Sequence, residues 1–196
     1  MFMEDDWYGS ADRAYIKGGY VLLDALCASG GYDVAQVRRA IEEGQLPRPT
    51  YRVEGGDWVP PDYLALLEEV LGDFSRVESV FAERFQEAYQ GRYGQPAPGP
   101  DVNQAWHDYL SGEYGICLWT ATPEHIVQKG WLMEQIRAHV QGADPTNQEW
   151  RAAASALVDA LDALERPWAA GDRLRFGTAL GRDVYVAGVR ALFDLP

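Results

Sequence analysis

The sequence predicts a mainly α-helical fold that carries one small β-hairpin. Apolar residues recur at helical spacing through most of the chain. Residues 51–59 instead hold two alternating apolar triplets around a glycine pair, which is typical of a hairpin. Residues 91–100 contain three glycines and three prolines, which favours a linker between an N-terminal unit and a helical bundle.

The individual elements follow from apolar spacing and from helix-ending residues. We expect helices over residues 11–29, 34–43, 61–71, 75–89, 101–110, 123–140, 147–165 and 183–193. Asp33 and Thr122 have the residue types of N-caps. Residues 114–119 are too short and too apolar to assign as helix or strand. The expected organisation is residues 1–92, a linker over 93–100, and a helical part over 101–196, with or without one shared core.

Charge and cysteine content restrict the classes of function. Thirty acidic residues against 17 basic ones give a formal charge of -13, which argues against general binding to nucleic acids or to membrane surfaces. Two cysteines form no disulfide framework. The acidic first six residues and the absence of an apolar run of about 18 residues indicate neither a signal peptide nor a membrane span. We therefore expect a cytoplasmic protein.

The first part of the chain resembles a known DNA-binding fold. Two helices, an extended turn and a hairpin are expected in that order, and residues 33–47 (DVAQVRRAIEEGQLP) look like a recognition helix with its exit. This pattern resembles the winged helix of the mercury-resistance regulator (MerR) and excisionase families. The resemblance implies DNA contacts by Arg38, Arg39, Arg48 and Arg52. Because residues 31–60 hold four arginines against five acids, the charge favours a scaffold over a DNA reader.

A second resemblance covers nearly the whole chain. Its residues are LPRPTY at 46–51, GEYGICL at 112–118, TPE at 122–124 and LDALERP at 161–167, with Arg182 and Asp183. They are similar to an actinobacterial family of unknown function whose members are labelled natural-product biosynthesis proteins. Fifteen arginines against two lysines, Lys17 and Lys129, fit the GC-rich genomes of actinobacteria. The resemblance implies a role in a biosynthetic pathway, and it supplies no catalytic residues to assign to this sequence.

The candidate catalytic residues are Cys117, His107 and Glu113. A cysteine becomes a nucleophile when a nearby base or helix N-terminus lowers its pKa, and both His107 and His125 are close in sequence. The alternative is that Cys117, flanked by Ile116 and Leu118, belongs to the core. Asp159, Asp162 and Glu165 form a second candidate, as a general acid in a cavity or as an ion-paired stripe.

Metal and phosphate chemistry have no supporting pattern. The three histidines, His107, His125 and His139, do not have the spacing of metal ligands on one helical face. The glycine pairs lack the spacing and the lysine of a phosphate loop. We therefore expect neither a metal nor another cofactor.

Seven tryptophans in a chain of this length suggest a ligand pocket or a large aromatic core. For a pocket, the candidates are Trp106, Trp119 and Trp131. Three functions then remain open. The first is an accessory or tailoring protein of natural-product biosynthesis that binds a small aromatic or apolar metabolite, with its reaction unassigned. The others are a winged-helix regulator that binds DNA and a non-catalytic interaction protein with an exposed apolar patch.

Overall fold

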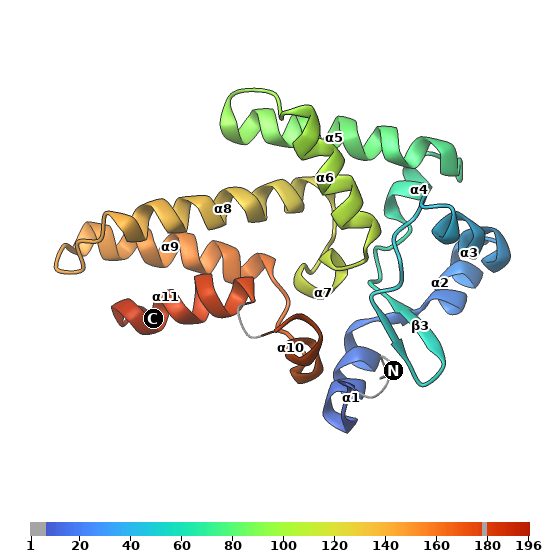
Figure 1. Ribbon diagram of the computed structural model, residues 1–196, viewed down its shortest axis with the longest axis horizontal. Helices are drawn as coiled ribbons and strands as arrows, with labels where there is room; N and C mark the ends of the chain where they lie inside the picture. Colours follow the sequence, from blue (N-terminus) through green and yellow to red (C-terminus); the bar gives the residue numbers. More distant parts are fainter. Residues whose placement is uncertain (1–6, 178–179) are drawn as a thin grey trace.

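The computed structural model describes residues 7–177 and 180–196, and it is mainly helical with one small sheet (Figure 1). This confirms the predicted fold class. The N-terminal elements are α1 (Ser10–Gly19), β1 (Val21–Leu22), α2 (Leu23–Gly30), α3 (Val34–Glu42), β2 (Tyr51–Val53) and β3 (Gly56–Val59). The remaining helices are α4 (Ala65–Glu69), α5 (Val77–Tyr93), α6 (Gly99–Leu110), α7 (Tyr114–Cys117), α8 (Pro123–Gln141), α9 (Gln148–Leu164), α10 (Ala170–Phe176), a π-helical turn (Asp183–Gly188) and α11 (Val189–Phe193).

The predicted hairpin is present as β2 and β3, which pair in antiparallel register with Tyr51 opposite Trp58. Asp33 caps α3 as predicted, because its Oδ1 accepts a hydrogen bond from the Ala35 backbone N–H at 2.8 Å. The prediction of a single helix over residues 11–29 is wrong. The chain becomes extended at Tyr20, and Val21 then pairs with Val59 of β3. The edge strand β1 thus divides the predicted helix into α1 and α2.

The helical part is built around α8, which has the antiparallel helix α9 on one side and α5, running in the same direction, on the other. In Figure 1, α8 and α9 run side by side, α11 lies along α9, and α5 covers the other side of α8. Thr122 caps α8 as predicted and accepts a hydrogen bond from the His125 N–H. Residues 114–117, which periodicity left open, form the short helix α7. The helix predicted over 183–193 begins as the π-helical turn, and α10 has no counterpart in the sequence prediction.

The predicted linker is shorter than its composition suggests. Helix α5 continues to Tyr93 and ends at Gly94, whose φ is +72°, and α6 begins at Gly99. Buried apolar residues from both sides of this connection form one continuous cluster, from Leu23 to Leu195. The two parts of the chain therefore pack on a shared core.

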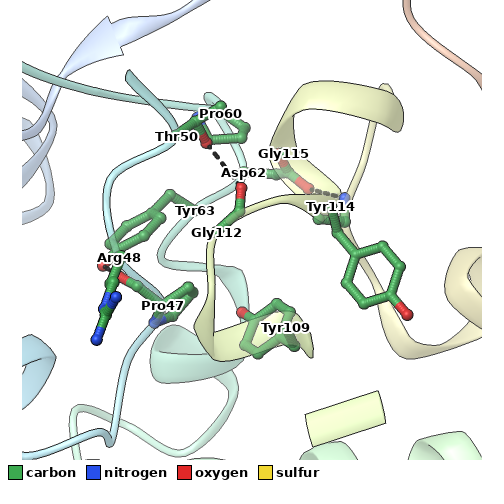
Figure 2. Close-up of a pocket in the computed structure, with 11 residues that line it drawn as sticks. Pro47, Arg48, Thr50, Pro60, Asp62, Tyr63, Tyr109, Gly112, Tyr114 and Gly115 are labelled. Carbon is green, nitrogen blue, oxygen red and sulfur yellow. Dashed lines mark hydrogen bonds between the residues drawn. The ribbon is translucent and has the colours of Figure 1, made fainter. Parts of the chain in front are cut away.

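A closely packed junction joins residues 47–50, which precede β2, to residues 109–115, which lead into α7 (Figure 2). The Arg48 N–H donates to the Leu110 carbonyl at 2.9 Å, and the Tyr20 hydroxyl donates to the Gly115 carbonyl at 3.0 Å. The cavity here measures only about 20 Å³ and lies among Thr50, Pro60 and Gly112. That volume is about the size of one water molecule. The junction is therefore a packing contact and too small for a metabolite.

Buried tyrosines should make the protein sensitive to alkali. Burial raises the pKa of the five buried phenols above the ordinary value of 10.0: Tyr8, Tyr20, Tyr51, Tyr63 and Tyr109. Below pH 10 both the folded and the unfolded chain keep these protons, so stability is complete. Above pH 10 only the unfolded chain releases them, so stability falls as the pH rises.

We expect the tyrosinate absorbance of these five phenols to rise together with the loss of circular dichroism, in one transition above pH 10. Full ionisation of all eleven tyrosines near pH 10, with the circular dichroism unchanged, would contradict this expectation.

Candidate functional site

A pocket of about 360 Å³ lies where α6, α7 and α8 meet residues 168–176 and 180–181. Its volume is in the range of small-molecule sites, about 300–1,000 Å³. We call it the Lys129 pocket. Its lining residues are Asp108, Glu113, Tyr114, Ile116, Cys117, Lys129, Met133, Trp168, Phe176, Leu180 and Gly181. Most of its walls are apolar or aromatic, and its charged groups are few.

A short backbone pairing brings residues distant in sequence to this pocket. Leu118 forms a β-bridge with Glu165, the Trp119 N–H donates to the Leu164 carbonyl, and the Arg166 N–H donates to the Cys117 carbonyl. The end of α7 and the end of α9 are therefore adjacent. Helix α8 adds Lys129 and Met133 one turn apart.

Lys129 and Glu165 form a buried ion pair, with 2.7 Å between Lys129 Nζ and Glu165 Oε1. The Glu165 side chain is fully buried and its Oε2 has no hydrogen-bond partner among the described residues. Burial alone would lower the pKa of Lys129, but its interactions with Cys117 and Glu165, including hydrogen bonds to both side chains, raise it above its ordinary value. Lys129 is therefore an ammonium at neutral pH, and the pair as a whole is neutral.

Cys117 contributes an uncharged thiol. Burial raises its pKa, and the ammonium of Lys129 offsets only part of that effect. Its Sγ lies 3.7 Å from the Tyr114 carbonyl, within the weak hydrogen bonds that thiols make. Because the nucleophilic form of cysteine is the thiolate, the geometry favours binding over thiol catalysis.

Gly181 lines the pocket and leaves space in it, because glycine has no side chain. A Cβ at this position would lie 3.5 Å from Glu165 Oε1, 3.9 Å from Met133 Cε and 4.0 Å from Lys129 Nζ. These are ordinary van der Waals contacts, so an added side chain would extend from a tolerated Cβ. Gly181 therefore offers a way to fill the pocket without displacing its walls.

The structure brings two of the three predicted catalytic residues to this pocket. Cys117 and Glu113 line it, whereas His107 is exposed on α6 and its Nδ1 lies 2.6 Å from the Asn103 carbonyl. His125 also lies outside the lining, with its Nδ1 2.6 Å from Thr120 Oγ1. No imidazole thus lies among the residues that line the pocket.

The three predicted ligand-binding tryptophans lie elsewhere. Trp106 is buried in the core against Phe81, with ring centroids 5.2 Å apart. Trp119 is 48% exposed and stacks under Arg166, and Trp131 stacks under Arg92. The tryptophan on the pocket wall is Trp168, whose buried Nε1 has no hydrogen-bond partner among the described residues.

Sequence reasoning missed Lys129 and the role of Glu165. The available signal for Lys129 was its rarity, since it is one of two lysines beside fifteen arginines. In the acidic row, Asp159 and Asp162 pair with Arg190, while Glu165 turns inward to Lys129. The ion-paired stripe therefore describes the first two acids, and the third pairs with Lys129 of the pocket lining.

The four arginines considered for DNA binding are exposed. Arg38 Nη2 lies 2.7 Å from Asp24 Oδ1, and Arg38 Nη1 lies 2.7 Å from Asp57 Oδ2. Arg52 contacts the same Asp57 at 3.1 Å. Arg39 is on the surface of α3, and Arg48 is beside the junction of Figure 2. Two of these four guanidinium groups are thus already paired with carboxylates.

Residues 7–177 and 180–196 hold neither a cluster of side chains suited to a metal nor a helix suited to a bilayer. No cluster of three or more histidine, cysteine, aspartate or glutamate side chains has the arrangement of a metal site. No described helix is both long and apolar enough to span a bilayer.

The fold and the pocket thus define a mainly helical protein with a small, largely apolar cavity around a buried lysine. A model described as a family of unknown function (DUF6058) matches residues 77–194, more than half of the chain. The chain belongs to this family. Every residue that lines the Lys129 pocket lies inside the matched range. No curated protein and no solved structure matches the chain.

Proposed function

We propose that this protein binds a small aromatic or apolar metabolite in the Lys129 pocket and acts as an accessory or tailoring protein of a natural-product pathway. The observation that carries the proposal is the pocket itself, a cavity of about 360 Å³ with mostly apolar walls and one lysine in its lining, Lys129, which pairs with the buried Glu165 behind it. An apolar cavity with a few placed polar groups is the usual form of a small-molecule site. The pathway context rests on the sequence resemblance to natural-product biosynthesis proteins.

The walls indicate the shape of the ligand. Trp168 and Phe176 contribute ring surfaces 6.1 Å apart between centroids, and Ile116, Met133 and Leu180 complete the apolar lining. Such surfaces bind planar or branched hydrocarbon groups by burying them from water.

The DNA-binding alternative has weaker support from the geometry. Asp57 lies between Arg38 and Arg52, at the face where a DNA-binding protein would present cations. Each of these ion pairs must break before the guanidinium group can bind phosphate. The winged-helix resemblance is therefore better explained as a scaffold that supports the helical part.

Filling the pocket floor tests the proposed function. We expect the neutral fluorescent probe N-phenyl-1-naphthylamine to bind the wild-type protein and to bind the Gly181→Leu variant at least about tenfold more weakly, because the leucine occupies the cavity. Fluorescence titration measures both affinities.

The matched control is Gly91→Leu, where a Cβ meets nothing within 4 Å on the exposed surface of α5. It should leave probe binding unchanged. Equal affinity of the probe for the wild type and for Gly181→Leu would place the probe outside the pocket and refute the proposal. Circular dichroism of both variants establishes that they fold.

A further inference from the structure

The charges at the Lys129 pocket are unbalanced at its mouth. Inside, Glu165 neutralises Lys129 at 2.7 Å. The two acids of the lining, Asp108 and Glu113, are exposed. Asp108 Oδ1 accepts a hydrogen bond from Gln104 at 2.8 Å, a neutral donor that leaves the carboxylate charge in place. A ligand entering the apolar cavity therefore passes two negative groups.

A second cavity of about 270 Å³ continues from the first. It shares Asp108 and Tyr114 with the Lys129 pocket and adds a third acid, Asp101. Its aromatic wall includes Phe85, Tyr89 and Tyr93, and the two tyrosine rings are stacked with their centroids 4.1 Å apart. The residues that line this second cavity include two acids and no lysine, arginine or histidine.

Aromatic surfaces and carboxylates both favour a positively charged ligand. The face of an aromatic ring carries negative electrostatic potential and attracts cations. Carboxylates around a cleft with apolar walls concentrate that field and raise the local concentration of cations. An anionic ligand would have to pass Asp108 and Glu113, and among the described residues that line the two cavities the one cation is Lys129, which Glu165 already pairs.

We propose that the Lys129 pocket selects a cationic ligand, a protonated amine attached to an aromatic or apolar body. The body occupies the cavity beside Trp168, and the ammonium group lies at the mouth near Asp108 and Glu113. This inference rests on the proposed function, since it uses the same pocket, and it adds the charge of the ligand.

The test compares three compounds that share one ring and differ in charge: tryptamine, indole and indole-3-propionate. At pH 7 and low salt, isothermal titration calorimetry should give the order tryptamine, then indole, then indole-3-propionate. We expect about a fivefold difference between the first two, the upper range for exposed charge pairs. Added sodium chloride should reduce the advantage of tryptamine and leave indole binding unchanged.

Two variants test whether Asp108 and Glu113 cause the preference for tryptamine. Asp108→Asn and Glu113→Gln should each lower tryptamine affinity about two- to fivefold and leave indole affinity unchanged. Glu42→Gln on α3 is the matched control, since it removes the same charge from an exposed residue outside both cavities. It should change neither affinity.

Equal binding of the three compounds, tighter binding of indole-3-propionate, or an equal effect of Glu42→Gln would overturn the proposal. Absence of binding by all three compounds would overturn it as well. Failure of the proposed function is distinguishable, because it is measured with the neutral probe and Gly181→Leu: a pocket that binds that probe but shows no preference for tryptamine refutes only the charge inference.

Discussion

Replacing Arg166 with alanine is expected to lower the free energy of unfolding by about 3–5 kcal/mol. The residue is 3% exposed, and its guanidinium group donates to the carbonyls of Leu118, Gly19 and Trp119 at 3.0, 2.9 and 3.2 Å. Alanine would leave these acceptors without their donor, at about 1–3 kcal/mol for each one that water cannot reach. Urea-induced unfolding followed by circular dichroism measures the loss.

Arg166 also lies between two aromatic rings, 4.6 Å from the centroid of Tyr20 and 4.8 Å from that of Trp119. Its contacts connect the end of α1 with the backbone pairing at residues 117–119. Arg166→Lys should therefore recover little, because one ammonium group cannot reach three carbonyls in the fork geometry of a guanidinium.

The control for this prediction is Arg38→Ala. Arg38 also has two polar partners, Asp24 and Asp57, but its side chain is 45% exposed. Exposed ion pairs contribute about 0–1 kcal/mol, so this variant should lose about 1 kcal/mol or less. Similar losses for the two variants would show that the buried position of Arg166 does not matter, contrary to the prediction.

Local sequence signals predicted the elements whose geometry is set locally. The hairpin follows from Gly55 and Gly56, and the starts of α3 and α8 follow from Asp33 and Thr122. The break at Tyr20 was not predictable in this way. It depends on the pairing of Val21 with Val59, a contact between residues far apart in sequence that helical periodicity does not report.

The same distinction applies to the candidate site. Cys117 and Glu113 were predicted as site residues, and both line the Lys129 pocket. Glu165 comes close to Lys129 of the lining at the point where residues 117–119 pair with residues 164–166, and no local pattern indicates that pairing. Spacing also cannot separate a tryptophan in the core, such as Trp106, from one on a cavity wall, such as Trp168.

The second large effect is expected at Gly112, in the junction of Figure 2. Its φ is +80°, a conformation that costs an L-residue about 1–2 kcal/mol. A Cβ would also lie 2.3 Å from the Arg48 carbonyl oxygen, which is backbone and must move. Displacing packed atoms adds about 1–3 kcal/mol. Gly112→Ala should therefore destabilise the protein by about 2–5 kcal/mol in urea unfolding.

Gly44→Ala separates the two causes. Its φ of +72° is nearly the same, but a Cβ there meets nothing within 4 Å, so we expect only the backbone cost of about 1–2 kcal/mol. The difference between the two variants measures the contact with Arg48. Gly112 lies within the matched range 77–194, whereas Arg48 lies outside it. A larger loss at Gly112 would thus show that the close approach of the Arg48 carbonyl requires glycine at this position, and equal losses would show that the Arg48 backbone can move away at no cost.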